Sequence, residues 1–250
     1  MPDFERLRLD MVDRQIVRRG VRDPHVLKAM RAVPRERFVG EAMAAFAYQD
    51  APLPIEEQQT ISQPYIVAAM IEAAEIGPGD RVLEVGAGSG YAAAVIGQIA
   101  DRVFAIERHE ALGRAARERM TALGYDNIDI RIGDGTLGLV DEAPFGAILV
   151  AAGGPEAPQA LKEQLVIGGH LVIPVGQPGR QNLCKITRLA EDRYEEEDLG
   201  VVAFVPLIGE QGWKPELDRG VPPSRHGGTP TSNLPHQGGG QVGKSPNGMT

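Results

Sequence analysis

"RVLEVGAGSGYAAAV", residues 81–95, is the stretch that decides the fold of this 250-residue chain. It begins with a short, mostly apolar run typical of a buried strand and ends in an alanine-rich run typical of a helix. Gly86, Gly88 and Gly90 lie between the two, where the missing Cβ lets the backbone come close to a ligand. A glycine-rich turn from strand to helix therefore predicts a ligand site at the carboxyl end of this strand.

Downstream of this stretch, the sequence alternates between strand and helix patterns. Short apolar runs predict four further strands, at residues 102–107, 127–132, 145–151 and 168–175. Helices are expected over about 109–123 and near 156–165. This order predicts an α/β fold, with a Rossmann-like, doubly wound and mostly parallel sheet between two layers of helices.

After Gly176 the pattern becomes rich in strands. "NLCKITRL" (182–189) and "LGVVAFVPL" (199–207) predict a closing antiparallel pair. The charged segment between them, "AEDRYEEED" (190–198), is interpreted as a solvated hairpin connection. Cys184 alternates with apolar residues in the first of these strands and is expected in the core.

The N-terminal part of the chain has no such alternation. Residues 4–47 predict helices that cap the sheet, and in "RDPHVLKAMRAV" (22–33) Asp23 is the expected helix cap with Pro24 in the first turn. A proline-rich loop then leads into a helix expected over about 63–74. We expect residues 1–78 to form a helical region with its loop, and residues 79–213 the ligand-binding domain.

The last segment, residues 214–250, contains eight glycines, six prolines and almost nothing large and apolar. Such a composition buries too little surface to offset the entropy of ordering, which predicts a disordered tail.

Bulk composition excludes several classes of protein. The net charge of −8 argues against a nucleic-acid partner, which would need a basic face. No apolar run approaches the roughly 20 residues that span a bilayer, and the charged N-terminus does not resemble a signal peptide. Cys184 is the only cysteine, which fits a cytoplasmic location. His25 and His170 have no partners at ligand spacing, so no metal site is predicted.

The spacing of the glycines narrows the ligand class. A dinucleotide fingerprint would need glycine at position 91, where this chain has Tyr91. The G-x-G-x-G pattern resembles instead the loop of class I S-adenosylmethionine-dependent methyltransferases. Glu107 ends the next strand, 21 residues after Gly86, where a carboxylate can accept hydrogen bonds from both ribose hydroxyls. The ligand is expected over the backbone amides of residues 86–90.

Ser62 admits two interpretations. In "QTISQPYIVAAM" (59–70) it precedes a predicted helix with Pro64 in the first turn, which is the pattern of an N-cap. The alternative is that its hydroxyl faces a substrate. Taken alone, the residues of this segment favour the N-cap.

A longer set of motifs resembles the protein-L-isoaspartate O-methyltransferase family, in order, over about residues 8–213. The motifs that carry the resemblance are "MVDRQIVRRGVRDPHVLKAMRAVPRERFV" (11–39), "QTISQPYIVAAM" (59–70), "PGDRVLEVGAGSGYAAAV" (78–95), "GDGTLG" (133–138), "APFGAILVAA" (143–152), "GGHLVIPVG" (168–176) and "FVPLIGEQGW" (204–213). The T-I-S-x-P segment and the N-terminal helices make the match specific to this family.

The resemblance implies an enzyme that transfers a methyl group from S-adenosyl-L-methionine to the free carboxylate of L-isoaspartyl residues in damaged proteins and peptides. S-adenosyl-L-homocysteine is the second product, and no obligate protein partner is implied. The resemblance places Ser62 at the active site as the catalytic residue. It implies that the cofactor is bound by Thr60, Ile61, Glu84, Gly86, Ala87, Gly88, Ser89, Gly90, Glu107, Arg108, Asp134 and Gly135.

The chain departs from the family pattern at two places. Glu56 and Gln58 stand where the family usually has glycines in the substrate loop, and Gly153 and Gly154 stand where alanines are more frequent. These departures leave open a related methyltransferase that acts on another carboxylate or on a small molecule. A non-catalytic module that has kept the nucleoside site is the alternative from another class.

Overall fold

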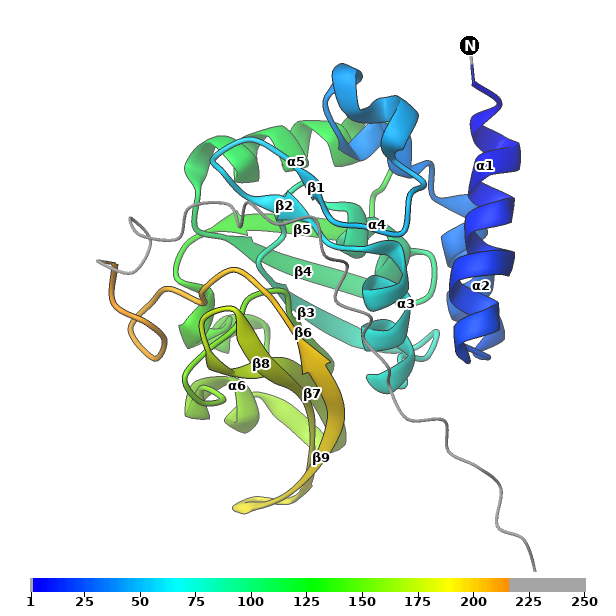
Figure 1. The fold of residues 1–250 in the computed structure, drawn as a ribbon. Coiled ribbons are helices and arrows are strands. Elements are labelled where there is room, and N and C mark those ends of the chain that lie inside the picture. Colours follow the sequence, from blue (N-terminus) through cyan, green and yellow to red (C-terminus); the bar gives the residue numbers. More distant parts are fainter. Residues whose placement is uncertain (1, 216–250) are drawn as a thin grey trace, which may run out of the picture.

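The computed structural model describes residues 2–215, which form a seven-stranded sheet with helices on both faces (Figure 1). The strand order is β5-β4-β3-β6-β7-β8-β9. Their bounds are β3 Arg81–Val85, β4 Arg102–Glu107, β5 Ile128–Ile132, β6 Phe145–Val150, β7 Leu165–Gln177, β8 Arg180–Ala190 and β9 Arg193–Val202. The first five strands of this order are parallel, whereas β8 and β9 are antiparallel. The predicted mostly parallel α/β sheet with closing antiparallel strands is confirmed.

Alternating side chains of the strands face two different helical layers. Val82, Val103 and Leu149 belong to a core shared with α3 (Pro64–Ala73), α4 (Tyr91–Gly97) and α5 (Glu110–Leu123). Leu83 and Phe104 point to the other face, which α6 (Gln159–Glu163) covers. This two-residue period is that of a strand buried on both faces.

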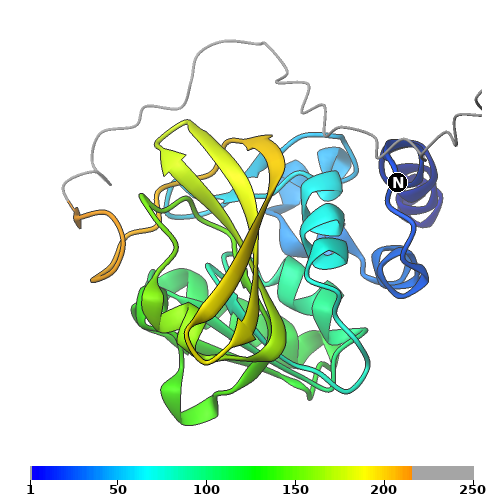
Figure 2. The same ribbon diagram turned by 90° about the horizontal axis from the view of Figure 1, so that it is seen from below.

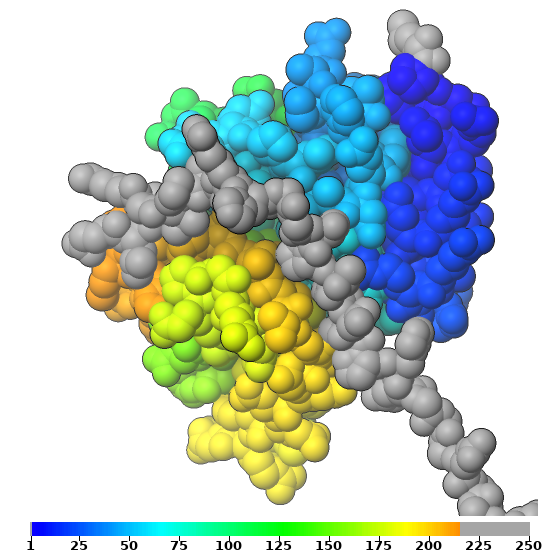
Figure 3. Space-filling view, in the orientation of Figure 1, coloured from blue at the N-terminus to red at the C-terminus, as the bar shows by residue number. Residues whose placement is uncertain are grey.

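The N-terminal region lies against the outside of α3 and α4 (Figure 2). It comprises α1 (Phe4–Met11), a π-helical turn (Val12–Ile16), α2 (Pro24–Ala32) and short 3₁₀ segments (Val17–Arg19, Arg35–Phe38, Glu41–Phe46). The Asp23 carboxylate accepts from the backbone N–H groups of His25 and Val26, as predicted for a cap. One apolar core extends from these helices to the sheet, and Figure 3 shows them packed along the rest of the body. The division at residue 78 stays a prediction.

Three features of the C-terminal half differ from the sequence prediction. The segment 190–198 is not a long connection, because β9 begins at Arg193 and only a two-residue turn precedes it. Its acidic residues pair with β8 in register, Glu196 opposite Ile186 and Glu195 opposite Thr187. An edge strand open to solvent tolerates such charges, which also oppose pairing with other chains. β7 begins at Leu165, three residues earlier than predicted, and α6 spans only Gln159–Glu163 of the predicted 156–165. From residue 216 on, the predicted tail lies outside the described residues.

Candidate active site

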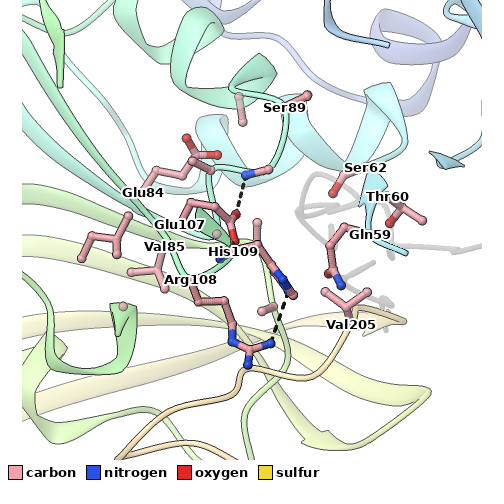
Figure 4. Close-up of a pocket in the computed structure, with 18 of the residues that line it drawn as sticks. Gln59, Thr60, Ser62, Glu84, Val85, Ser89, Glu107, Arg108, His109 and Val205 are labelled. Atoms are coloured by element: carbon pink, nitrogen blue, oxygen red, sulfur yellow. Dashed lines mark hydrogen bonds between the residues drawn. The ribbon is translucent and has the colours of Figure 1, made fainter. Parts of the chain in front are cut away.

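A pocket lies at the carboxyl ends of β3 and β4, beneath the segment that joins β2 (Thr60–Ile61) to α3. The space between its walls is about 880 Å³, a volume that includes open solvent. The pocket brings together most of the residues that the sequence nominated. Those in its lining are Thr60, Ile61, Ser62, Glu84, Gly86, Ala87, Gly88, Ser89, Glu107, Arg108 and Gly135. In Figure 4, Ser62 and Thr60 lie on one side and Glu84 and Glu107 on the other.

The glycine loop owes its shape to left-handed backbone. Gly86, Gly88 and Gly90 have φ values of 91°, 52° and 85°, a region that favours glycine. The N–H groups of Gly86 and Ala87 both donate to the carbonyl of Ile106. The loop therefore offers a ligand close approach of its backbone, while the amides of Gly86 and Ala87 are already bonded within the protein.

Glu107 is the last residue of β4 and is 4% exposed, and its carboxylate holds the glycine loop in place through hydrogen bonds. One carboxylate oxygen accepts from the N–H of Gly88 at 2.8 Å, and the other accepts from the N–H of His109 at 2.9 Å. An ionised carboxylate has about four acceptor positions, so about two remain for a ligand. The position and the remaining lone pairs suit a pair of ribose hydroxyls.

Glu84 is a second carboxyl group of the pocket wall, and it is 2% exposed. Its Oε2 has no hydrogen-bond partner among the described residues. Burial, together with the nearby charge of Glu107, raises the pKa of Glu84 to about 8. In the folded protein without ligand, this side chain therefore carries a proton at neutral pH.

Replacing Glu84 with glutamine is expected to change how stability depends on pH. Between the unfolded pKa of 4.5 and the folded pKa of about 8, the native state holds a proton that the unfolded state has lost. The contribution of Glu84 is thus complete below pH 4.5 and declines as pH rises, by about 2 kcal/mol between pH 5 and 7. The variant should gain stability relative to the wild type by that amount over this interval.

Urea unfolding of both proteins at pH 5, 6 and 7 measures the difference directly. Glu110→Gln, on the exposed first turn of α5, is the control and should run parallel to the wild type. A constant offset between the Glu84→Gln variant and the wild type across the three pH values would contradict the prediction.

Ser62 is not the cap of α3. The N-cap is Gln63, with φ −50° and ψ 135° and no side-chain capping bond. The reason is Pro64 at the first helical position, because proline forces the residue before it into extended backbone. Ser62 therefore lies one position outside the helix end. It is half-buried, and its hydroxyl has no hydrogen-bond partner in the part of the chain that the structure describes, while the residue lines the pocket.

Two nominated residues do not line the pocket. Gly90 is the left-handed N-cap of α4, where a Cβ would meet Met120 Cε at 2.8 Å. The Asp134 carboxylate accepts from Thr136 and from the backbone N–H of Glu210, so it ties the turn after β5 to the C-terminal segment. Their direct contact with a cofactor stays a prediction.

The C-terminal segment, which forms part of the pocket wall, is held in place by Gly153, one of the two glycines that depart from the family pattern. Gly153 donates to the carbonyl of Val205, and its own carbonyl accepts from the N–H of Leu207 and the indole of Trp213. A Cβ on Gly153 would lie 2.7 Å from the Gln181 side chain. Trp213 thus fastens this segment and is not in the pocket lining.

Several lining residues were not nominated from the sequence. They are Gln59, Val67, Val85, Tyr91, Ala92, Ile106, His109, Ala151, Ala152, Val205, Pro206, Leu207 and Ile208. Most are apolar and carry no chemical signature of their own. The run 205–208 did carry a signal, because it belongs to the motif "FVPLIGEQGW" of the family resemblance.

The loop between β1 (Leu53–Pro54) and β2 carries the other departures from the family. Glu57 and Gln58 have left-handed φ values of 55° and 56°, which side chains rarely adopt. Ile55 of this loop lies over Gly88, where a Cβ would be 3.5 Å from Ile55 Cδ1. Glu56 and Gln58 are exposed and do not line the pocket.

The lining residues fit a nucleoside better than a dinucleotide. Glu107 has lone pairs that remain for hydroxyl groups, and the protonated Glu84 has an Oε2 without a partner among the described residues. A pyrophosphate would instead need donors, and the loop amides of Gly86 and Ala87 are already bonded within the protein. Within residues 2–215, no cluster of His, Cys, Asp or Glu could hold a metal ion, and no helix has the length and apolarity to cross a membrane.

Comparison with known proteins agrees with this geometry. A family model described as "Protein-L-isoaspartate(D-aspartate) O-methyltransferase" matches residues 7–212. The protein-L-isoaspartate O-methyltransferase of Methylorubrum extorquens is 60% identical over 208 residues, which are 83% of this chain and 91% of the relative. That of Brucella anthropi is 54% identical over 85% of this chain and 98% of the relative.

Solved structures give the same result. A structure described as a protein-L-isoaspartate O-methyltransferase has a TM-score of 0.75 and 27% identity, covering 83% of this chain and 67% of the other. A putative enzyme of this kind from Plasmodium falciparum, solved in complex with S-adenosyl-L-homocysteine, has a TM-score of 0.70 and 27% identity over 83% of this chain and 99% of the other. With its family model, its relatives and its fold in agreement, the chain belongs to the protein-L-isoaspartate(D-aspartate) O-methyltransferase family.

Proposed function

We propose that this protein transfers a methyl group from S-adenosyl-L-methionine to the free carboxylate of L-isoaspartyl residues in damaged proteins and peptides. The resulting ester can cyclise to a succinimide and so lead back to normal aspartate. The observation that carries the proposal is one pocket lined both by the glycine loop with Glu107 and by the T-I-S segment with Ser62. Membership of the family supports the same activity.

Methyl transfer to a carboxylate does not require a general acid or base from the protein. When bound, S-adenosyl-L-methionine supplies an electrophilic methyl carbon on a sulfonium. An isoaspartyl carboxylate with an ordinary pKa near 4 is already ionised at neutral pH, so no general base is required. The residues of the pocket have to orient the acceptor oxygen in line with the methyl carbon and exclude water. Well-oriented proximity contributes on the order of 7–11 kcal/mol to such a reaction.

We assign the orienting role on the acceptor side to Ser62. Its hydroxyl can donate to one carboxylate oxygen and leave the other oxygen to react. On the cofactor side, Glu107 has lone pairs for the ribose hydroxyls, and Gly86 and Gly88 let the ligand approach the backbone. The other proposed cofactor contacts are made by the remaining nominated residues of the pocket wall, which are Thr60, Ile61, Glu84, Ala87, Ser89, Arg108 and Gly135.

Labelled methyl transfer to a synthetic isoaspartyl peptide tests the proposal. We expect incorporation into that peptide, none above background into the otherwise identical aspartyl peptide, and release of the label by mild base, as for an ester. Equal labelling of both peptides, or none of either, would favour a methyltransferase with another acceptor. Binding of S-adenosyl-L-homocysteine with no acceptor in a whole-cell lysate would favour a non-catalytic module.

We infer that the enzyme works in the cytoplasm, because a chain with a single cysteine has no internal disulfide to lose in a reducing compartment. The single cysteine, Cys184, is buried, and burial raises the pKa of its thiol to about 12. Such a buried free thiol is compatible with a reducing compartment.

A further inference from the structure

Arg35 is a charged residue with no exposed surface, and it lies outside the pocket lining. It belongs to the short 3₁₀ segment Arg35–Phe38 of the N-terminal region. Long charged side chains are almost never fully buried unless they are paired. Its position therefore calls for an explanation.

The guanidinium joins three segments that lie far apart in sequence. Its Nε donates to the carbonyl of Ala47 at 2.7 Å, and its Nη2 donates to the carbonyl of Ser62 at 2.8 Å. Its central carbon lies 4.7 Å from the centre of the Tyr91 ring. Tyr91 is the first residue of α4 and lines the pocket directly after the glycine loop. Arg35 thus touches the acceptor side and the cofactor side of the site together.

Stability alone does not account for this arginine. No carboxylate among residues 2–215 forms an ion pair with it, and its Nη1 has no hydrogen-bond partner there. Burial lowers the pKa of the guanidinium, because removal from water disfavours its charged form. Apolar side chains of similar volume often replace such buried charges without loss of stability. The fixed fork of its donors, by contrast, suits the holding of two carbonyls at set positions.

We propose that Arg35 is a positioning residue for methyl transfer, which holds the backbone of Ser62 at a fixed place relative to the helix that follows the glycine loop. The inference rests on the proposed function, because it assigns Ser62 to the acceptor. In-line transfer is sensitive to small displacements, and a shift of about 1 Å can cost on the order of 100-fold in rate. Loosening the Ser62 carbonyl therefore slows the reaction even though Arg35 touches neither substrate.

A double-mutant cycle between Arg35→Met and Ser62→Ala tests this role. The turnover number and the KM for an isoaspartyl peptide are measured for the wild type, each single variant and the double variant. We expect Arg35→Met to lower kcat by about tenfold in the wild-type background. In the Ser62→Ala background it should lower kcat by less than about twofold, because the hydroxyl that it positions is gone.

Arg37→Met is the matched control, since Arg37 lies two residues away in the same 3₁₀ segment and is exposed. It should leave kcat unchanged in both backgrounds. Hydrogen exchange over residues 58–66 gives a readout that does not depend on activity. Exchange there should rise in Arg35→Met and not in Arg37→Met.

The outcomes are distinct. Equal losses of kcat in both backgrounds would assign Arg35 a purely structural role and overturn the proposal, as would unchanged exchange over residues 58–66. A wild type inactive on the isoaspartyl peptide would refute the proposed function, and the exchange data would still decide the positioning. If Arg35→Met does not fold, Arg35→Lys takes its place in the same cycle, because lysine keeps the charge and lacks the fixed planar fork of donors.

Discussion

Replacing Ser62 with alanine is expected to lower turnover on an isoaspartyl peptide by about 10²–10³-fold, the usual cost of removing one oriented donor at a reacting oxygen. The hydroxyl has no partner in the described part of the chain, so nothing in the fold uses it. The free energy of unfolding should therefore change by less than about 0.5 kcal/mol. Affinity for S-adenosyl-L-homocysteine should stay near that of the wild type. Single-turnover rates, urea unfolding and calorimetry measure the three quantities.

This pattern distinguishes catalysis from capping. A helix cap lost to alanine costs about 1 kcal/mol of stability and leaves the chemistry intact. The structure predicts the reverse, because Gln63 is the N-cap of α3. Thr121→Ala, which removes an exposed hydroxyl of α5, is the control for loss of a hydroxyl as such. Turnover of the Ser62→Ala variant at the wild-type rate, or a stability loss of the size of a cap, would remove Ser62 from the reaction.

The parallel strands could be predicted from the sequence because burial on both faces leaves a continuous apolar run. β3 and β4 begin and end at the predicted residues for this reason. β9 could not be recognised in the same way. Its Glu195, Glu196 and Glu197 show no apolar alternation, and they are in a strand because β8 offers an edge to pair with. Pairing of this kind depends on tertiary structure and leaves no local pattern.

The residues of the site also differ in whether a local sequence pattern predicts them or only the tertiary structure brings them in. The glycine loop and Glu107 are signalled within one strand–helix–strand unit, β3–α4–β4, and 11 of the 13 nominated residues line the pocket. The run 205–208 reaches the same pocket only because β7, β8 and β9 lead the chain back across the sheet. Arg35 gives no local signal at all, since its partners at Ala47, Ser62 and Tyr91 meet only in the folded protein.

Replacing Glu107 with glutamine is expected to weaken binding of S-adenosyl-L-homocysteine by about 1.5–3 kcal/mol, or roughly 10- to 150-fold. The carboxylate can use its remaining lone pairs to accept from two hydroxyls while it holds the N–H groups of Gly88 and His109. An amide of the same shape has one acceptor oxygen, and its NH₂ group faces donors where the second oxygen was. Part of the loss therefore comes from the ligand and part from a loosened glycine loop.

Calorimetric titration gives the affinity, and thermal unfolding without ligand separates the two contributions. Glu110→Gln, three residues further along the chain and exposed, should bind as the wild type does. An apo protein of Glu107→Gln that unfolds near the wild-type temperature but binds at least tenfold more weakly would assign the carboxylate to the ligand. Unchanged affinity would take Glu107 out of the site, and it would leave the bonds to Gly88 and His109 as its whole role.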